Sequence, residues 1–574
     1  MSLPVANVDQ NTRRGVISVL AAFVIVTVFA FVAFAIDTSR ITSTQNAMQN
    51  AVDAAALAAS QEVMYAVQQA AENGSSAGDA NSIAVDAARV MAQQVAAANG
   101  VYIHPTNDVE FGKRSYNQSS QTWTIQWNVA PYNVIKVSAR RDQEDLQAAD
   151  GKFPMAFGWA VGKPSVSIQT SATAFVEARD LVLCMDYSGS MNDDSTISAF
   201  GLRGKANVEA NLDEMWNSLV NANPLFAGTS KSKFPATGFG GINSASGTYH
   251  SSTSATTVFN ALNLGATDSS GNLLYPFPQA GRNSDGSFKS MPGAAASETA
   301  WKAYISHVMN LSSSSGYKRM YGYRTLMDYL MTQKPKNVNS EDLWRTPHYP
   351  FKGVKDATTL FLDFLGDLDF GDEVGYVSFA TTSRAETTLN EDGYSISIAS
   401  NPITNDYNSI NIMQVHKQAG HYDTTTGTGY GIKEARLMLA NHMRFGARPT
   451  ILVMSDGLAN VYPSGWSLPS GWSWAAVTDF DGNGTADYTT SDKAKQYAFY
   501  EAKVAVDAGY TIHTLGVGLN ADVPFMEALA FMGSGISINI PGDTSVAQMQ
   551  QDLLDAFSKI AAKVPAPKLV DAGN

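Results

Sequence analysis

The 574-residue sequence has one cysteine, Cys184, so a disulfide within the chain is excluded. Because Cys184 stands in a run of apolar residues, we expect an inert buried thiol rather than a reactive one. Charged residues make up only 16% of the chain, and 39 basic against 52 acidic side chains leave a net charge of −13. No basic stripe offsets this charge, which argues against a nucleic acid partner.

Motifs of common catalytic and nucleotide-binding sites are missing too. The sequence contains no H-E-x-x-H metalloprotease motif and no P-loop. Its eight histidines are scattered, and His416, His421 and His513 do not have the spacing of metal ligands. We therefore predict that the protein is not an enzyme, and we assign no catalytic residue.

Long apolar runs are rare, with one exception at residues 16–36 that only two hydroxyl residues interrupt. At about 1.5 Å per residue, a helix of this length crosses a hydrocarbon core of about 30 Å. Arg13 and Arg14 precede the run, so the positive-inside rule places residues 1–15 in the cytoplasm and the bulk of the chain in the periplasm or outside the cell. A cleaved secretory signal is the alternative, but the run is longer than the usual apolar region of such signals. We therefore predict a retained, single-pass membrane anchor.

The next two segments differ in their hydrophobic period. Residues 37–100 are rich in alanine, the best helix former, and predict a helical stalk that continues the anchor to about Glu72. Its small side chains allow close approach of another helix, either that of a partner or the chain's own next helix at residues 81–98. Residues 101–178 instead alternate polar and apolar side chains, as in W-T-I-Q-W-N-V, which predicts a small antiparallel β-rich module.

The N-terminal segment resembles a known family. The Arg-Arg-Gly start, the span that ends in A-I-D-T-S-R and the stretch Q-N-A-V-D-A-A-A-L-A-A are similar to the N-terminal module of TadE/TadG-like proteins, which belong to the tight-adherence (Flp) pilus assembly machinery. The resemblance covers residues 11–62 and implies that other pilus-assembly proteins are partners. It departs from the related pseudopilins at their cleavage site, because Leu20 stands where they carry a glutamate, five residues after the glycine.

The most informative stretch lies at residues 179–191. Its apolar run, residues 181–185, ends in a D-x-S-x-S pattern formed by Asp186, Ser188 and Ser190. The run predicts a buried parallel strand, and open α/β sheets bind ligands at the carboxyl ends of such strands. A carboxylate and two hydroxyls are hard oxygen donors of the kind that Mg²⁺ prefers. The pattern therefore predicts a loop that holds a metal.

The remainder of the chain alternates strands and helices between residues 350 and 562. Helical spacing marks residues 431–443, an apolar strand-like run follows at 449–454, and a closing helix is expected at 545–562. This alternation predicts an α/β fold with a doubly wound parallel sheet.

Residues 192–350 interrupt this pattern just after the predicted metal-binding loop. We interpret them as a large insertion, which is either a ligand-recognition lobe or lid beside the site, or a polar embellishment. Residues 563–574 form a C-terminal tail.

Residues 179–562 resemble a von Willebrand factor A domain with a metal-ion-dependent adhesion site, interrupted by the insertion. Besides D-x-S-x-S, the resemblance rests on T-G-T-G-Y-G-I before a helix and on S-D-G at the end of a strand. It assigns the threonine of the second loop to Thr426 and the aspartate of the third loop to Asp456. It implies an Mg²⁺ or Mn²⁺ ion held by the hydroxyls and aspartates of three loops, with one position open for a carboxylate from a protein partner.

A second metal signal lies at residues 479–487, D-F-D-G-N-G-T-A-D. The residues that match ligand positions of an EF-hand loop are Asp479, Asp481, Asn483, Thr485 (through its backbone oxygen) and Asp487. Gly484 occupies the turn position, but Thr490 stands where a bidentate glutamate closes a full EF-hand. We therefore predict a weak Ca²⁺ site, with a metal-free turn of Asn and Asp residues as the alternative.

Together these features predict a bacterial, membrane-anchored Tad-type pilus assembly or adhesion protein that binds a protein partner through a divalent metal. The alternative is an extracytoplasmic structural scaffold of the pilus machinery, without metal-dependent ligand binding. Loss of partner capture on chelation would separate the two.

Overall fold

The computed structural model describes residues 12–72, 77–222, 238–239, 242–243, 245–278, 282–283, 285–541, 548, 551–552, 555–556, 559–560 and 567–570. The chain divides into two compact units, Met1–Glu177 with Val564–Asn574, and Ala178–Lys563. The predicted fold class is confirmed, because the first unit has a long apolar helix and a small sheet, and the second has a parallel sheet between helices. Most of the closing helix predicted at 545–562 lies outside the described residues.

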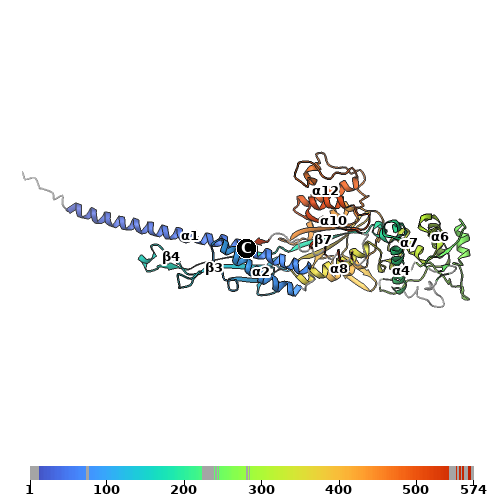
Figure 1. Cartoon of the computed structure of the whole chain (residues 1–574), viewed down its shortest axis with the longest axis horizontal. Coiled ribbons are helices and arrows are strands. Elements are labelled where there is room, and N and C mark those ends of the chain that lie inside the picture. The colour runs from blue at the N-terminus through green and yellow to red at the C-terminus, as the bar shows by residue number, and fades with distance from the viewer. Residues whose placement is uncertain are drawn as a thin grey trace, which may run out of the picture. The chain divides into compact units, whose positions relative to one another are not determined.

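Helix α1 (Thr12–Glu72) is 61 residues long and changes character along its length (Figure 1). The large apolar side chains between Ile17 and Ile36 are exposed, and the helix is long and apolar enough to cross a membrane. Farther on, α1 packs on α2 (Ala77–Ala98), and Ala51 and Ala55 are fully buried in this part of α1. The alanine-rich face thus packs on the chain's own next helix, which is one of the two alternatives that the sequence allows.

An antiparallel sheet completes the first unit, with strand order β2-β1-β3-β6-β20. Its strands are β1 (Val109–Asn117), β2 (Thr122–Trp127), β3 (Val134–Arg141), β6 (Ile168–Phe175) and β20 (Lys568–Leu569). Between β3 and β6, the strands β4 (Phe153–Pro154) and β5 (Ser165–Val166) pair around a loop that contains the 3₁₀ turn η1 (Gly158–Val161). Side chains of β2 alternate between exposed and half-buried positions, in line with the alternation in the sequence.

The second unit is built on a sheet with strand order β13-β12-β7-β17-β18-β19, and β16 pairs with β12. The strands are β7 (Arg179–Asp186), β12 (Glu373–Phe379), β13 (Ser383–Ala385), β16 (Ile403–Thr404), β17 (Arg448–Ser455), β18 (Thr511–Val517) and β19 (Ser534–Ile540). β13 and β16 run antiparallel to β12, and the other pairs are parallel. Every residue of β7 is buried, because helices cover both faces of a parallel sheet.

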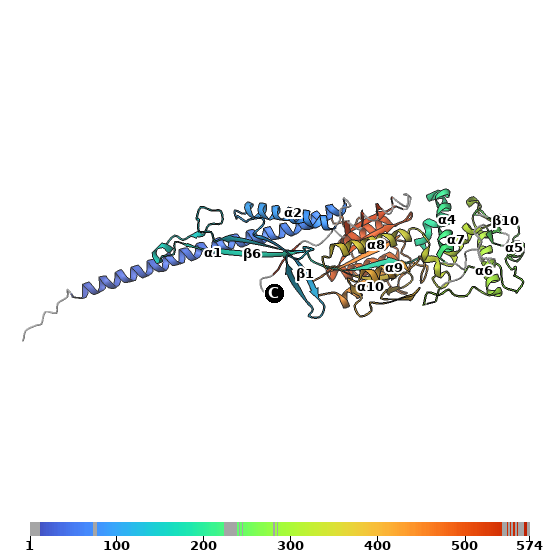
Figure 2. The same ribbon diagram turned by 90° about the horizontal axis from the view of Figure 1, so that it is seen from below.

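Helices cover the two faces of this sheet (Figures 1 and 2). Leu183 and Met185 of β7 join a core with α8 (Phe351–Leu368) and α9 (Tyr407–Val415). Val182 and Cys184 point to the opposite core, which contains α10 (Thr428–His442), α12 (Lys493–Asp507) and α13 (Val523–Met532). Cys184 is fully buried, and burial raises the pKa of its thiol well above the ordinary value, which fits the inert thiol expected from the sequence.

The direction in which the sheet grows reverses beside β7. The chain passes from β7 to β12 on one side of it, and later adds β17 on the other side. In open α/β sheets, ligands bind outside the carboxyl ends of the strands at such a reversal. Asp186 ends β7 and Asp456 follows the last residue of β17, so the fold itself brings two candidate metal ligands to this point.

The insertion between β7 and α8 has secondary structure and a core of its own. Its helices and turns are η2 (Gly189–Ser195), η3 (Ile197–Ala199), α3 (Phe200–Arg203), α4 (Lys205–Ala222), α5 (Ala255–Ala261), α6 (Ala294–Asn310), η4 (Ser313–Ser315), α7 (Tyr323–Gln333) and η5 (Glu341–Arg345). Short strands β8 (Gly238–Phe239) and β9 (Ile242–Asn243) pair, as do β10 (Thr248–Tyr249) and β11 (Met320–Tyr321). Trp301, Tyr304 and Leu326 are fully buried in the core of this lobe. The insertion is therefore a folded lobe, and a purely polar embellishment does not describe it.

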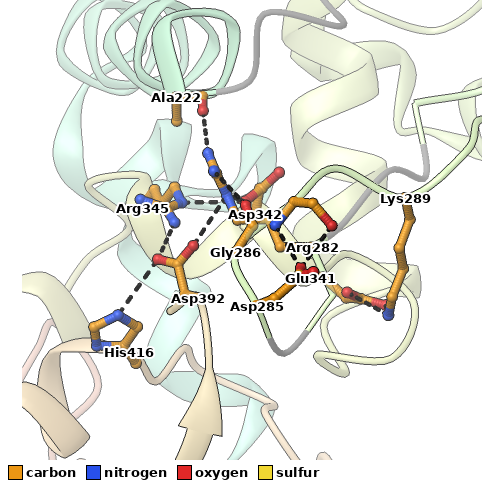
Figure 3. Close-up of polar contacts among 11 residues, drawn as sticks. Ala222, Arg282, Asp285, Gly286, Lys289, Glu341, Asp342, Arg345, Asp392 and His416 are labelled. Atoms are coloured by element: carbon orange, nitrogen blue, oxygen red, sulfur yellow. Dashed lines mark hydrogen bonds and ion pairs between the residues drawn. The ribbon is translucent and has the colours of Figure 1, made fainter. Parts of the chain in front are cut away.

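A cluster of charged side chains fastens the lobe to the sheet domain (Figure 3). Arg345 of η5 donates to Asp342 at 3.1 Å and also pairs with Asp392, which lies in the turn between β14 (Thr388–Glu391) and β15 (Tyr394–Ser397). Arg282 lies 3.4 Å from Asp342 and 3.2 Å from Asp392. His416, after α9, faces Asp392 from the other side at 3.5 Å. Two arginines thus bridge an aspartate of the lobe and an aspartate of the sheet domain.

Candidate metal site at the carboxyl edge of the sheet

The first loop of the site begins at Asp186, the fully buried last residue of β7. Oδ1 of Asp186 accepts a hydrogen bond from the backbone N–H of Ser188 at 2.8 Å. Oδ2 accepts one from the hydroxyl of Ser455 at 2.5 Å. The hydroxyl oxygens of Ser188 and Ser190 lie 3.0 Å apart. The D-x-S-x-S pattern therefore places its three side chains together, as the sequence predicts.

The second loop contains Thr426, which is buried, and backbone groups of this loop are hydrogen-bonded to both other loops. The N–H of Thr426 donates to Oδ1 of Asn460 at 2.8 Å, and its carbonyl accepts from the N–H of Asn460 at 2.8 Å. Two residues earlier, the carbonyl of Thr424 accepts from the N–H of Gly189 at 3.0 Å. A Cβ on Gly189 would lie 3.3 Å from that of Thr424, so glycine allows the two loops to approach closely.

The third loop carries Asp456, directly after β17. This side chain is 4% exposed; its Oδ1 accepts from the N–H of Leu458 at 3.1 Å. Its Oδ2 is buried and has no hydrogen-bond partner among the described residues. A buried carboxylate oxygen without a partner is costly in a folded protein, and a bound cation would satisfy it.

The electrostatics of the site favour a positive ion. Burial and the charge of Asp456 raise the pKa of Asp186 well above its ordinary range. Burial also raises the pKa of Asp456, although the Ser190 hydroxyl and the Leu458 N–H lower it. The largest causes of these two pKa shifts include no basic side chain. Two carboxylates with adjacent hydroxyls in a buried pocket suit a hard divalent cation such as Mg²⁺ or Mn²⁺.

Two acidic residues that the sequence-based prediction omits line the same small cavity. Asp193 and Asp194 belong to η2 and border the cavity together with Ser190 and Asp456. Asp194 is 2% exposed; its Oδ1 accepts from the N–H of Leu519 at 3.3 Å, and its Oδ2 has no hydrogen-bond partner among the described residues. Burial, with the charge of Asp456, raises the pKa of each to about 6. The signal in the sequence is the N-D-D that follows D-x-S-x-S directly.

The candidate calcium loop also brings its acidic residues together. Carboxylate oxygens of Asp479, Asp481 and Asp487 lie within 4.8 Å of one another. The N–H of Asn483 donates to Asp479 at 3.0 Å and to Asp481 at 3.1 Å, so this turn is also held without a metal.

The calcium loop matches an EF-hand at its turn position but not at its last position. Gly484 has a left-handed backbone, with φ of +85°, as the turn position requires. The hydroxyl of Thr490 accepts from the N–H of Asp492, and the side chain of Asp492 caps α12. The last loop position is therefore engaged in the start of the next helix. The hydroxyl and N–H of Thr485 both donate to Oδ1 of Asn483 at 2.5 and 2.8 Å.

Comparison with known proteins shows that the N-terminal segment is similar to a pilus-assembly family. Residues 15–71 match the family described as "Putative Flp pilus-assembly TadE/G-like", which confirms the resemblance of this segment to TadE/TadG-like proteins. The match covers the anchor and most of the rest of α1 (Thr12–Glu72). None of the curated proteins matches the chain.

Solved structures resemble the chain at low sequence identity. BatB from Bacteroides thetaiotaomicron is 18% identical over 37% of this chain and 88% of its own, with a TM-score of 0.24. A von Willebrand factor type A structure from Catenulispora acidiphila is 14% identical over 37% of this chain and 38% of its own, with a TM-score of 0.24. The PilB minor pilin from Streptococcus sanguinis is 10% identical over 80% of this chain and 87% of its own, with a TM-score of 0.28.

Proposed function

We propose that this chain is a membrane-anchored component of a Tad-type pilus machinery whose second unit binds a protein partner through a divalent cation. The family match at residues 15–71 supports the pilus role and makes other pilus-assembly proteins candidate partners. The exposed apolar stretch of α1 supports a single membrane span. Arg13 and Arg14 before this stretch favour a cytoplasmic N-terminus, so the second unit lies in the periplasm or outside the cell.

The observation that carries the metal proposal is the buried pair Asp186 and Asp456, one of whose oxygens has no partner. Mg²⁺ or Mn²⁺ would be held by the hydroxyls of Ser188, Ser190 and Thr426 and by the two aspartates, directly or through water. The bound ion would supply a Lewis-acidic position that a carboxylate of a protein partner can occupy. The pattern resembles the adhesion site of von Willebrand factor A domains, which supports this use.

We also propose that the site binds without catalysing a reaction. The three loops, residues 186–194, 424–430 and 456–461, contain no His, Lys or Cys. General acid–base catalysis near neutral pH usually uses such a side chain. The aspartates of the site are engaged with hydroxyls and backbone N–H groups instead.

The alternative is a scaffold that spaces or caps the pilus machinery without metal-dependent affinity. One observation favours it: both oxygens of Asp186 already accept hydrogen bonds, so the first loop holds its shape from protein contacts alone. The two functions predict opposite responses to chelation, which makes them separable.

The test is calorimetric titration of Mg²⁺ or Mn²⁺ into the full chain in detergent, followed by capture of partners from solubilised membranes with Mg²⁺ or with EDTA. Asp456→Asn should abolish the binding heat and the Mg²⁺-dependent capture. Asp507→Asn, which changes an exposed aspartate of α12, should leave both unchanged. Capture that is equal in Mg²⁺ and EDTA would establish the scaffold function instead.

A further inference from the structure

A loop of the first unit exposes large apolar side chains to solvent. Residues 155–164, between β4 and β5, have the sequence M-A-F-G-W-A-V-G-K-P. Trp159 is 68% exposed, Val161 78% and Phe157 40%. The segment contains no acidic residue, although the chain as a whole carries a net charge of −13, and its one charged side chain is that of Lys163. Clusters of exposed apolar side chains mark surfaces that bind another protein, a ligand or a membrane.

Backbone constraints hold these side chains outward. The N–H of Lys163 donates to the carbonyl of Gly158 at 2.9 Å and closes the turn. A Cβ on Gly158 would clash with the backbone carbonyl oxygen of Lys163, so only glycine fits there. Gly162 takes a left-handed conformation with φ of +73°. The turn is thus built to present Trp159 and Val161 rather than to bury them.

The loop is attached to α1 at one particular level, Asp37. This carboxylate is 5% exposed; its Oδ1 accepts from the N–H of Ala156 at 2.7 Å and its Oδ2 from the N–H of Phe157 at 3.0 Å. One turn farther along α1, the guanidinium of Arg40 lies 5.2 Å from the ring centre of Phe153. Figure 1 shows the β4 region beside α1, projecting toward the N-terminal part of that helix.

Asp37 is also the first residue after the apolar stretch of α1. A helix that spans the bilayer with residues 16–36 places Asp37 where the hydrocarbon core ends and the headgroup region begins. The loop hydrogen-bonded to Asp37 is therefore held at that same boundary. Tryptophan prefers this region, because its ring is apolar and its indole N–H still finds a polar partner there.

We propose that residues 157–163 are a second membrane contact, in which Phe157, Trp159 and Val161 enter the outer interface of the bilayer that α1 crosses. Lys163 lies at the end of the loop and faces the phosphates of the lipid headgroups. The proposal rests on the anchoring proposed above. A bilayer is the occupant that the position requires, since any chain anchored by α1 carries this loop to the lipid surface. Two contacts at one level fix the rotation and tilt of α1, which a lone span leaves free.

The pairing with Asp37 has a consequence for the anchor itself. A carboxylate at the edge of the hydrocarbon core is expensive unless it is hydrogen-bonded. The two backbone N–H groups of the loop satisfy both of its oxygens. The loop therefore shields the charge of Asp37 from lipid while its own apolar side chains contact the same lipid.

The test uses single labelled cysteines in the full chain, reconstituted at one copy per nanodisc of phosphatidylethanolamine and phosphatidylglycerol. Cys184 is fully buried and stays unlabelled, so the natural sequence serves as background. Trp159→Cys carries an environment-sensitive dye at the loop. Phe29→Cys replaces a side chain that is 69% exposed within the apolar stretch, and its dye reports on the anchor. Val338→Cys replaces a side chain that is 72% exposed in the second unit, and its dye is the reference for a position in water.

Lipids with a spin label near the headgroup should quench the dye at position 159 at least twofold, with a blue-shifted emission. The dye at position 29 should be quenched more strongly by spin labels deep in the bilayer. The dye at position 338 should be quenched neither by the headgroup labels nor by the deep labels. A dye at 159 that behaves like the one at 338, while 29 is quenched, overturns the loop proposal and leaves the anchor intact. An unquenched dye at 29 removes the anchor, and the loop proposal with it.

Discussion

The hydroxyl of Ser455, the last residue of β17, donates a hydrogen bond of 2.5 Å to Oδ2 of Asp186, the last residue of β7. The same hydroxyl oxygen accepts from the N–H of Gly457 at 2.8 Å. Ser455 therefore joins the first loop of the site to the third and sets the orientation of the Asp186 carboxylate. Side chains that orient metal ligands in this way contribute to affinity without touching the ion.

Ser455→Ala should weaken Mg²⁺ or Mn²⁺ binding about tenfold, because residues that orient metal ligands typically contribute about 10–100-fold. Calorimetric titration of the full chain measures this change. Ser306→Ala, on the exposed side of α6, is the matched control and should bind the metal as the natural chain does. Equal affinities for the Ser455 and Ser306 variants would show that Ser455 does not orient a metal ligand.

The contribution of Asp193 and Asp194 to the stability of the metal-free chain should fall as the pH rises from about 4 to about 6. Burial raises the pKa of Asp193 and Asp194 to about 6, above the value of about 3.9 for an unfolded aspartate. The folded state thus holds protons that the unfolded state has released, and raising the pH removes that advantage. Mg²⁺ should offset the loss, since it binds the deprotonated site.

Thermal unfolding at a series of pH values, in EDTA and in Mg²⁺, checks this dependence. The increase in Tm that Mg²⁺ causes should be small at pH 4.5 and larger at pH 7. An increase that does not change with pH would mean that these carboxylates take no part in binding the ion.

Thr426→Ala should lower metal affinity, whereas Thr426→Ser should retain most of it. The backbone contacts of Thr426 with Asn460 persist in both variants, so the comparison isolates the hydroxyl. Circular dichroism establishes that both variants are folded, and titration with Mn²⁺ gives the affinities. Retained affinity in the alanine variant would remove Thr426 from the set of ligands.

Asp481→Ala should abolish Ca²⁺ binding at residues 479–487 and leave Mg²⁺ binding at the site of Asp186 intact. The loop is exposed and lacks a closing glutamate, so we expect a dissociation constant of about 10⁻⁴–10⁻³ M, as in weak extracellular sites. Titration with Ca²⁺ measures it, with Asp285→Ala in another exposed turn as the control. Identical Ca²⁺ heats for the natural chain and Asp481→Ala would leave the metal-free turn as the correct interpretation.

Arg345→Ala should destabilise the second unit by about 1–3 kcal/mol, because it leaves Asp342 and Asp392 with one arginine between them. Lys289→Ala, which breaks a more exposed pair with Glu341 in the same region, should cost less than about 1 kcal/mol (Figure 3). Urea unfolding followed by fluorescence gives both values. Similar costs for the two variants would contradict the bridging role of Arg345.

The sequence predicts the central part of the site because its signal is local. Asp186, Ser188 and Ser190 follow a strand whose every residue is buried, and a fully buried parallel strand shows in sequence as a continuous apolar run. Asp194 is different. The N-D-D after D-x-S-x-S puts Asp194 close to the first loop in sequence, but the hydrogen bond that it accepts comes from Leu519, more than three hundred residues later, and no spacing in the sequence reveals such a contact.

Two elements of the second unit escape prediction for physical reasons. Helix α13 is apolar around most of its surface, so it lacks the stripe that identifies a helix with one buried face. Strand β19 ends the order of the sheet, and its side chains are mostly half-buried, so no apolar run marks it. The core of the insertion escapes as well, because Trp301, Tyr321 and Tyr329 come from separate segments that only the fold assembles.

The central claim is that three loops hold one divalent cation, and diffraction from crystals grown with Mn²⁺ tests it most directly. We expect an anomalous peak in contact with the oxygens of Ser188, Ser190 and Asp456, with one coordination position open to solvent or to a carboxylate. Absence of that peak at saturating Mn²⁺, with the three loops ordered and unchanged, would contradict the metal site and leave the scaffold function.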